Sequence, residues 1–470
     1  MADGEFTALD RHILGEVWTS DEAYRNLAYL CDDVGHRFAG SPSEHAGAQY
    51  LLGKMREYGL ANVRLEEFSM ASWERGTCTL KLTAPVEREF SAIAMPFCPS
   101  ADIEAEVIDV GEGELPDFER VGSAVAGKIV LTDAETNRPG ERKSHRNDKF
   151  GWAVERGALA VVYMNQNPGL LHITGSITGR RPGSSAADRE APIPGIGISF
   201  EAGKAIRRLA QRGTARLHLT TTNRTFDSTS ANVVGEVVGT ARPNEVVLLG
   251  GHYDGHDVAQ GAGDDGAGTI TGLEAGRALA GLAGQLKRTV RVICFGSEEV
   301  GLLGAWHHAA LHAGANSEER FRFVMNLDGA GRGNGGGEQV TVSGMPEVVA
   351  YFEQVAGALP YEFGVRNELN SHSDHFPFAL RGIPNGTLSS RDTSAGLVGR
   401  GWGHTEADTL DKVYLRGLQT SAILAARLAV RLANDEAYPG RQRTEDEVRE
   451  QLKDAGLLER QERAGRFPPK

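Results

Sequence analysis

The sequence predicts an α/β fold, in which a three-layer α/β/α domain carries a separate, inserted β-rich domain. From about residue 244 onward, short apolar runs rich in β-branched residues lie at 245–251, 289–295 and 322–327. Helical stretches at 268–283 and 301–312 separate these runs. Strands that are separated by helices form parallel sheets with both faces covered. The chain has 470 residues, enough for two domains, because domains usually contain about 100 to 200 residues.

The middle third of the chain has a different texture, which predicts the inserted domain. It contains short β-like runs at 127–133, 158–164 and 216–222, and a turn-rich segment at 175–197. We therefore assign residues 1–79 and 227–436 to the three-layer domain and residues 80–226 to the inserted domain.

Both ends of the chain are predicted to be helical. Residues 21–62 have the pattern of two helices joined by a turn at Gly40 to Pro42. Near the other end, Thr444 to Glu447 is a capping-box pattern that opens a short charged helix, and the RFPPK end is expected to fray. Residues 437–470 are therefore assigned to a charged helix and tail without chemistry.

Composition and charge exclude several classes of protein. The balance of 63 Asp and Glu against 50 Lys and Arg argues against a nucleic-acid-binding surface. No stretch approaches the ~20 apolar residues of a membrane span. The first residues contain acids where an export signal needs a basic start and an apolar run, so we expect a cytoplasmic protein, or a secreted one if a signal was removed or is unconventional. The four cysteines lack CxxC spacing, so a metal must be held by His, Asp and Glu.

The first chemical groups follow the run at 245–251. His252 and Asp254 stand at its carboxyl end, which is where ligands bind in such sheets. Asp254 is placed to hold the ring of His252, as metal-bound histidines usually require. Alone, a His-x-Asp pattern is structural more often than functional.

The glycine-rich segment that follows contains two adjacent acids. Gly261 to Gly268 satisfies the G-x-G-x-x-G pattern of dinucleotide sites. We reject that interpretation, because the glycines do not directly follow a strand and the acids would repel a pyrophosphate. The segment fits a backbone that bends closely around a cation, and Asp264 is our candidate for an acid that bridges two metal ions.

Three further elements bring more candidate ligands to the same edge. Glu298 and Glu299 follow the run at 289–295. The side chains of adjacent residues point in different directions, so one acid can bind a metal ion while the other reaches a metal-bound water. An isolated Glu-Glu pair is more often a solvated helix start. Asp328 ends the run at 322–327, and His404 lies in a loop before the last long helix.

Taken together, these residues predict two metal sites. One bridging Asp, two His, one Glu and one further Asp supply two sites with three ligands each, and both keep room for water. This open coordination is expected of catalytic zinc.

At these residues the chain resembles the M28 family of co-catalytic zinc exopeptidases, most closely its carboxypeptidase Q-like members. The resemblance rests on three stretches, GHRFAGSP (35–42), Trp73 to Gly76 and Gly251 to Gly268. It extends to His404 and includes a protease-associated-like insert. It implies a three-layer zinc-exopeptidase (phosphorylase/hydrolase-like) catalytic domain, short peptide substrates and a possible homodimer.

The resemblance also implies a role for each residue. His252 and Asp328 complete one metal site and Glu299 and His404 the other, with Asp264 bridging two Zn²⁺ ions, for which Co²⁺ or Mn²⁺ are possible substitutes. Glu298 becomes the general base and Asp254 the carboxylate that orients the first histidine. Asp374 and His375 resemble a substrate-binding segment, although His372 and His375 equally suit loop histidines. Asp265 is left as a supporting or structural residue.

Two groups of histidines need separate comment. His256 stands where the closest relatives tend to have an aromatic residue, which puts the pocket shape in doubt, although an exposed His is the commoner explanation. His307, His308 and His312 lie on the helix after Glu299. The spacing of the last two could mimic a metal site, but HExxH chemistry is absent, so we expect surface or packing residues.

The predicted reaction is hydrolysis of a terminal peptide bond by a metal-bridged hydroxide, with Glu298 taking the proton. Two alternatives stay open, a non-catalytic binding protein on the same scaffold and a glutaminyl-cyclase-like transferase with one zinc ion. The sequence does not distinguish aminopeptidase, carboxypeptidase and dipeptidase action.

Overall fold

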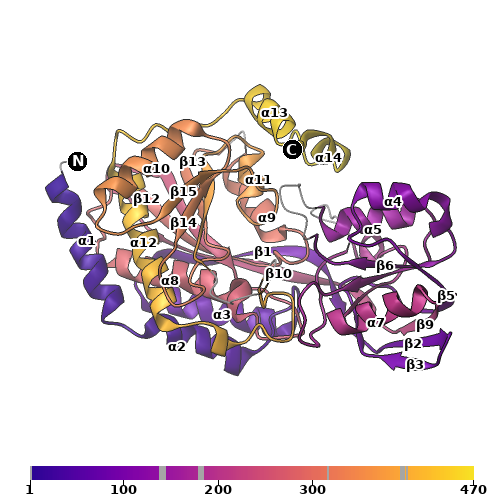
Figure 1. Ribbon diagram of the computed structural model, residues 1–470. Coiled ribbons are helices and arrows are strands. Elements are labelled where there is room, and N and C mark those ends of the chain that lie inside the picture. Colours follow the sequence, from indigo (N-terminus) through magenta and orange to yellow (C-terminus); the bar gives the residue numbers. More distant parts are fainter. Residues whose placement is uncertain are drawn as a thin grey trace.

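The computed structural model describes residues 3–136, 144–177, 185–314, 317–391, 397 and 401–469. Figure 1 shows a larger lobe, which contains both ends of the described chain, and a smaller lobe beside it. A long antiparallel ribbon of β1 and β10 runs from one lobe toward the other, with Ala61 paired with Glu236 and Glu74 with Arg224. The chain therefore enters and leaves the smaller lobe through neighbouring strands.

The larger lobe is built on an eight-stranded mixed sheet. Its strands, in spatial order, are β1 (Ala61–Glu74), β10 (Arg224–Val237), β12 (Arg288–Phe295), β11 (Arg242–His252), β13 (Arg320–Asn326), β16 (Asn385–Ser389), β14 (Gln339–Val342) and β15 (Gly364–Asn367). The four central strands, β12, β11, β13 and β16, run parallel to one another. As predicted, the runs at 245–251, 289–295 and 322–327 are parallel neighbours. Toward the edges, β10 and β14, which lie outside these runs, pair antiparallel.

Helices cover both faces of this sheet. They are α1 (Asp3–Trp18), α2 (Glu22–Ala28) with a π-helical turn (Tyr29–Val34), α3 (Pro42–Glu57), α8 (Ala267–Ala280), α9 (Leu303–His312), α10 (Pro346–Ala358), α11 (Phe376–Ala379) and α12 (Leu415–Asn434). Side chains alternate along a strand, so Val247 and Leu249 of β11 pack in the core with α8 and α12, while Val246 and Leu248 pack in the core with α9 and α11. The continuous apolar run of β11 therefore follows from burial on both faces.

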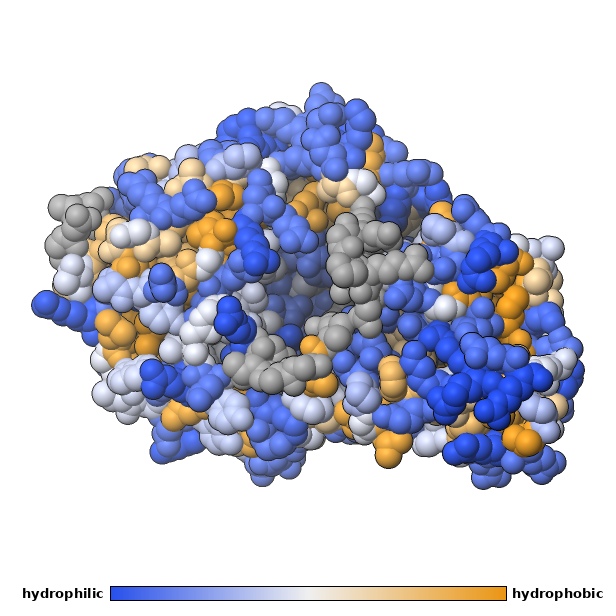
Figure 2. Space-filling model, viewed as in Figure 1, coloured by the Kyte–Doolittle hydropathy of each residue, from blue (hydrophilic) through white to orange (hydrophobic). Residues whose placement is uncertain are grey.

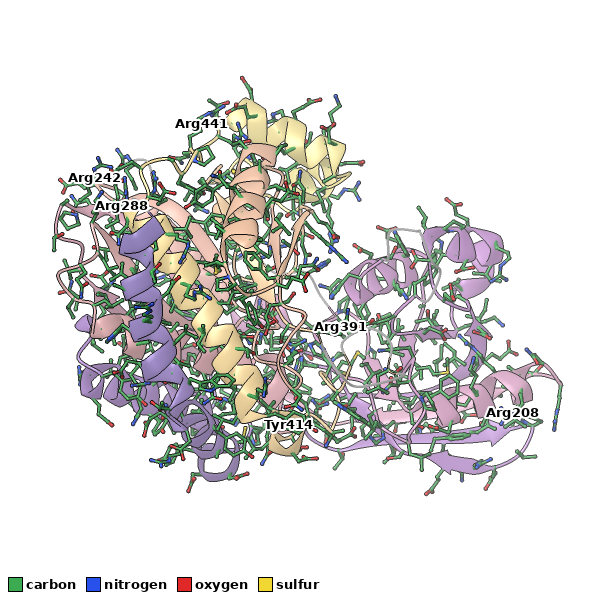
Figure 3. All side chains as sticks on the ribbon, turned by 60° about the vertical axis from the view of Figure 1, so that its left-hand side comes forward. Arg208, Arg242, Arg288, Arg391, Tyr414 and Arg441 are labelled. Atoms are coloured by element: carbon green, nitrogen blue, oxygen red, sulfur yellow. The ribbon has the colours of Figure 1, made fainter. Side chains whose placement is uncertain are left out.

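The smaller lobe has its own eight-stranded sheet. Its strands, in spatial order, are β3 (Arg88–Phe90), β2 (Cys78–Ala84), β9 (Arg216–Thr221), β5 (Ala101–Asp109), β6 (Ile129–Asp133), β7 (Ala160–Met164), β8 (Gly195–Ile198) and β4 (Ala92–Ala94). Its helices are α4 (Leu115–Val121), α5 (Arg146–Glu155), α6 (Ala186–Arg189) and α7 (Phe200–Ala210). In Figure 3, Arg208 marks the outer part of this lobe and Arg391 lies near the junction of the lobes.

The smaller lobe is therefore a mixed α/β unit with a strand-rich core, and its predicted limits at 80 and 226 stay a prediction. Of its turn-rich segment, residues 178–184 lie outside the described part of the chain.

The C-terminal segment forms two helices, α13 (Glu445–Asp454) and α14 (Leu458–Arg463). The Thr444 hydroxyl accepts the Glu447 amide proton and the Glu447 carboxylate accepts that of Thr444, so the predicted capping box is present. The prediction of a frayed end is wrong up to Phe467, which is 4% exposed and packs in the core that contains Val448 and Leu452. An apolar side chain that removes its surface from water holds the tail on the larger lobe.

No helix in the described part of the chain is long and apolar enough to span a bilayer.

Candidate metal centre

The candidate site lies at the carboxyl ends of β12, β11 and β13. From β11 the chain crosses to β12 on one side and later to β13 on the other. Such a reversal of strand order leaves a crevice at the carboxyl ends, where ligands bind in α/β sheets. The register places His252 of β11 opposite Phe295 of β12, and Gly250 opposite Asn326 of β13. Residues that follow these strands therefore meet at one edge.

His252 ends β11, and its ring is held from behind. Nδ1 donates to the backbone oxygen of Asp254 at 3.0 Å and lies 3.5 Å from the Asp254 carboxylate. The Asp254 carboxylate also accepts the amide protons of Glu298 and Glu299, at 2.9 and 3.2 Å. Asp254 thus fixes the first histidine and the Glu-Glu turn together, which the sequence alone did not indicate.

The two adjacent acids of the glycine-rich segment face different groups. Asp264 Oδ1 is 3.6 Å from His252 Nε2, and Asp264 Oδ2 is 3.4 Å from His404 Nε2. Asp265 lies with His252 and Asp328 in a group whose ligand atoms are within 4.8 Å of one another. Asp264 therefore lies between His252 and His404, whereas Asp265 lies on the side of His252 and Asp328.

Two glycines make room for Asp265. A Cβ atom on Gly251 or Gly268 would lie 2.4 Å from an Asp265 carboxylate oxygen. Burial, with the neighbouring Asp328 carboxylate, raises the pKa of Asp265 well above its usual value. The glycines thus admit a buried carboxylate beside the backbone.

Glu298 and Glu299 diverge as adjacent side chains of one turn. Glu299 Oε2 is 3.1 Å from His404 Nε2, while Glu298 Oε2 lies 3.9 Å from His252 Nε2. Burial, with the neighbouring Glu299 and Asp374 carboxylates, raises the pKa of Glu298 well above its usual value. A carboxylate with a raised pKa accepts a proton more readily.

Asp328 stands two residues beyond β13 and faces Arg332. The Arg332 guanidinium lies 3.6 Å from the Asp328 carboxylate and 3.5 Å from that of Asp264, and it donates to the Gly263 carbonyl at 2.7 Å. This arginine is a permanent positive charge beside the carboxylates, and sequence reasoning missed it.

His404 is positioned by the smaller lobe. Its Nδ1 donates to the Thr174 carbonyl at 3.0 Å, and the Thr174 amide donates to the His404 carbonyl at 3.0 Å. Nearby, the His172 amide donates to the Glu406 carboxylate at 3.0 Å. These contacts direct His404 Nε2 toward Glu299 and Asp264, so the two lobes build the site together.

Three buried residues that the sequence analysis did not assign hold the loops in place. Arg37 donates to the carbonyls of Tyr253 and Gly261, at 2.6 and 2.9 Å. Asp408 accepts the Gly263 and Asp264 amide protons at 2.7 and 3.1 Å; its burial and the Asp264 charge raise its pKa to about 6.

Glu44 accepts from the Ser297 amide at 3.1 Å and from Ser230 at 2.8 Å. Its burial, with the Asp254 charge, raises its pKa to about 8. The only sequence signal for Arg37 was its place in the GHRFAGSP stretch, and Glu44 lies just beyond it.

A cavity of about 100 Å³ opens over Glu298 and Glu299 between the lobes. On the face shown in Figure 2, the hollow between the lobes is lined by hydrophilic residues. Ser371 and His372, just before the predicted substrate segment, line the cavity. Asp374 and His375 are buried, with His375 Nε2 3.1 Å from the Asn370 carbonyl. Their assignment to substrate binding stays a prediction.

The donor set fits a divalent metal. Imidazole nitrogens and carboxylate oxygens are zinc ligands, and the five predicted ligands converge within the distances given above. Buried carboxylates outnumber the positive charges beside them, and in the described chain neither oxygen of Asp374 nor Asp265 Oδ2 accepts a hydrogen bond. Buried charge of this kind requires a counterion.

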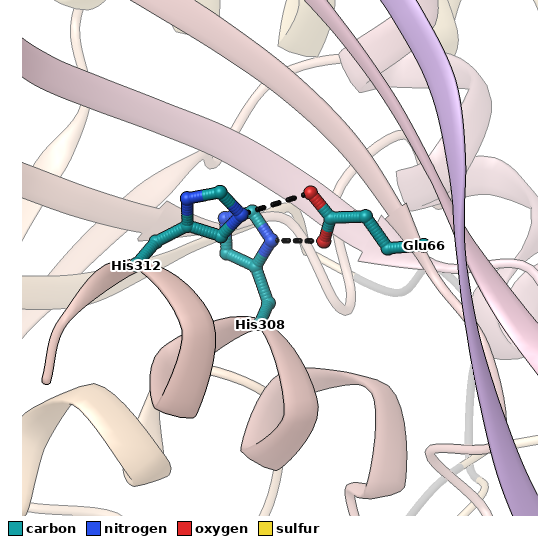
Figure 4. Close-up of side chains that lie close together, drawn as sticks. All are labelled: Glu66, His308 and His312. Carbon is teal, nitrogen blue, oxygen red and sulfur yellow. Dashed lines mark hydrogen bonds and ion pairs between the residues drawn. The ribbon is translucent and has the colours of Figure 1, made fainter. Parts of the chain in front are cut away.

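A second cluster of histidines and carboxylates lies elsewhere in the larger lobe (Figure 4). Glu66 of β1 accepts from His308 at 2.6 Å and from His312 at 3.0 Å, both on α9. Arg64 donates to Glu66 at 2.7 Å, and Arg291 Nη1 lies 3.4 Å from His308 Nε2. Because Nδ1 of His308 faces Glu66 and Nε2 faces a guanidinium, this ring is held as a proton donor to Glu66. The predicted packing role fits this arrangement.

Comparison with known proteins agrees with the architecture. Residues 232–429 match the model of peptidase family M28, and residues 98–206 match that of the PA domain. The chain therefore contains a peptidase family M28 domain. Its PA domain is inserted in the catalytic domain, between β1 and β10.

Relatives and solved structures support this placement of the chain. It is 30% identical over 316 residues to carboxypeptidase Q of Rattus norvegicus, covering 66% of this chain and 64% of the rat protein, less than two thirds of its length. A peptidase M28 precursor from Shewanella amazonensis superposes with a TM-score of 0.79 at 22% identity, covering 94% and 100% of the two chains. A zinc aminopeptidase from Bacillus subtilis superposes with a TM-score of 0.66 at 23% sequence identity, covering 88% of this chain and 95% of that protein. The two structural matches establish the fold.

Proposed function

We propose that this chain is a zinc exopeptidase that binds two ions and hydrolyses a terminal peptide bond of short peptides. The position of Asp264 carries the proposal, because its two carboxylate oxygens lie near His252 on one side and His404 on the other. Two-metal hydrolases hold their ions about 3.5–4 Å apart, a spacing that one carboxylate spans. The match of residues 232–429 to peptidase family M28 supports peptide bonds as the substrate.

In this proposal, His252, Asp264 and Asp328 hold one ion. Asp264, Glu299 and His404 hold the other. When bound, zinc ions supply Lewis-acid stabilisation of developing negative charge and lower the pKa of water toward ~7. Co²⁺ or Mn²⁺ ions are accepted by the same kinds of donor.

Glu298 is the proposed general base. It lines the cavity beside the metal ligands, so its carboxylate takes a proton from the attacking water and passes it to the leaving amine. Asp254 holds the Glu298 amide at 2.9 Å and thereby fixes the direction of that side chain. The Glu298 carboxylate is thus positioned by a residue that also orients His252.

The test combines metal content with hydrolysis of defined peptides. Purified protein is treated with a chelator, reloaded with Zn²⁺, and assayed on di- and tripeptides with free, N-blocked or C-blocked ends, with products identified by mass spectrometry. We expect two zinc ions per chain and cleavage that stops when one end is blocked; the end that matters identifies amino- or carboxypeptidase action.

Two other outcomes would favour the alternatives. One zinc ion per chain, with cyclisation of N-terminal glutamine, would support a glutaminyl-cyclase-like transferase. Two bound ions without hydrolysis of any peptide would support a binding protein on the same scaffold. Either result contradicts the proposal.

A further inference from the structure

His256 is a buried histidine whose contacts the predicted ligand set does not explain. It follows β11 by four residues and is 5% exposed, which corrects the expectation of an exposed side chain. Its Nε2 lies 3.0 Å from Glu299 Oε2, and its ring meets the His404 ring edge-on at 4.4 Å between centroids. Within the described chain neither ring nitrogen makes a hydrogen bond. The contact with Glu299 is an ion pair only when the ring is protonated, and Nδ1 has no partner within the described residues. Burial of such a ring is costly unless it binds a further group.

We propose that His256 is a further ligand of the ion held by Glu299 and His404. The proposal rests on the proposed function, because it adds a donor to one of the two metal sites. It assigns that site four protein ligands, with Asp264 as the shared one. The ligand taken is a divalent ion that prefers imidazole, above all Zn²⁺.

The distances among the donor atoms support this assignment. Glu299 Oε2 is 3.0 Å from His256 Nε2 and 3.1 Å from His404 Nε2, and ligand atoms of the three residues lie within 4.8 Å of one another. Zinc–ligand bonds of about 2.0–2.2 Å in a tetrahedron separate donor atoms by roughly 3.3 Å. The 3.0 Å pair is within hydrogen-bond reach, but its geometry does not form such a bond.

The turn that carries His256 is fixed from two sides. Arg75 binds the Asp257 carboxylate through two contacts, at 2.5 and 2.8 Å. On the other side, the Gly255 amide donates to the Arg37 carbonyl at 3.0 Å. A ligand on a loop held in this way loses little freedom when it binds a metal. The arginine of the Trp73 to Gly76 stretch thereby acquires a function in the site.

An added imidazole makes the two metal sites unequal. The site with Asp264, Glu299, His404 and His256 is closed by four protein donors, whereas the site with His252, Asp264 and Asp328 has three and keeps an open position. The closed site should fill first and hold its ion more tightly. Imidazole favours zinc, cobalt or nickel over manganese or magnesium, so the difference between the sites should shrink with Mn²⁺.

Competitive titration tests this inference. Metal-free protein is titrated with Zn²⁺ against a chromophoric chelator, and we expect two ions of unequal affinity. Loss of even a supporting residue costs about 10- to 100-fold in metal affinity, so H256F should weaken the tighter ion by more than about 100-fold. H256Q should do the same, since an amide can hydrogen-bond Glu299 but is a poor zinc ligand. H312A, in the second histidine cluster, should leave both affinities unchanged.

X-ray absorption at the zinc edge gives a readout independent of activity. In protein loaded with two ions, three histidines bind zinc, namely His252, His256 and His404, and H256F should lose one of these imidazoles. Unchanged affinity in H256F would overturn the inference. Wild-type affinity in H256Q would also overturn it, because His256 would then act as a hydrogen-bond partner of Glu299. H256Q remains informative if H256F does not fold.

Failure of the proposed function gives a different result. If the proposed function is wrong, the wild-type chain will not hydrolyse peptides or will bind fewer than two ions. Failure of the His256 inference is seen as variants with unaltered affinity and imidazole count while wild-type hydrolysis persists.

Discussion

The candidate metal centre and the Glu66 cluster contain the same kinds of side chain, but their charges are balanced differently. Around Glu66, each histidine donates a proton to the carboxylate, and Arg64 adds a further donor. Arg291 binds the neighbouring Glu319 through two contacts, at 2.6 and 2.9 Å. Positive charges and protons of the chain thus satisfy this cluster.

At the candidate metal centre, the carboxylates that surround Asp264 face imidazoles and the guanidinium of Arg332, which lies 3.5 Å from the Asp264 carboxylate. In both clusters, sets of three His, Asp or Glu side chains lie with their ligand atoms within 4.8 Å of one another. The difference teaches that composition and spacing do not define a metal site. What distinguishes one is a surplus of buried acceptors that the protein itself does not neutralise.

The largest effect should come from the bridging position. D264N removes the charge shared by the two proposed sites, so zinc content should fall from two ions per chain to fewer than about one, and hydrolysis should be lost. Elemental analysis of the purified variant checks this. E66Q, which removes the equivalent charge from the other cluster, should keep its full metal content; a loss of zinc there would break the comparison.

A smaller loss is expected from the proton acceptor. E298Q keeps the proposed metal ligands intact, so turnover should fall by roughly 10² to 10⁴ at unchanged zinc content. Steady-state kinetics and elemental analysis on one preparation measure both quantities. Undiminished turnover would remove Glu298 from the mechanism.

The Glu66 cluster should respond in stability. E66Q removes the charged acceptor of the buried His308 and one of the two carboxylates that His312 faces, and hydrogen bonds to charged groups contribute about 1.5–3 kcal/mol. Urea unfolding of the metal-free protein measures the change. The neighbouring E67Q, on the exposed face of β1, should stay near wild type, and equal losses in both variants would contradict the buried network.

The smallest effect concerns pH. Burial lowers the pKa of His308 to about 4, whereas an unfolded His titrates at about 6.5. Between these values the unfolded chain binds a proton that native His308 does not, so this residue lowers the free energy of unfolding as pH falls. H308Q should lose that slope, at most about 1.4 kcal/mol per pH unit, while H45Q at an exposed position should keep it. An unchanged slope in H308Q would contradict the prediction.

Residues at the ends of central strands were open to prediction because parallel strands place their carboxyl ends at one edge. His252 and Asp328 directly follow apolar runs, and Glu299 stands four residues after one; the structure places all three at the same edge of the sheet. The positions of the central strands needed only the short, apolar, β-rich runs.

The supporting residues were not predictable in the same way. Glu44, Asp408 and Thr174 reach the site from elements distant in sequence, through hydrogen bonds that leave no local pattern. Nor did the sequence indicate that β10 and β14 run antiparallel, because that depends on where the ribbon and the last strands return to the sheet. His256 was assigned to the surface because burial of a loop histidine depends on contacts across the fold.

The pair of hydrogen bonds between Thr174 and His404 has a consequence for how the protein matures. A chain synthesised only as far as α10 already carries His252, Asp264, Glu299 and Asp328, yet it lacks His404. When His404 emerges, Thr174 of the earlier-made PA domain is the partner that orients it. The proposed donor set is therefore completed only after the PA domain, which orients its last member, has been synthesised.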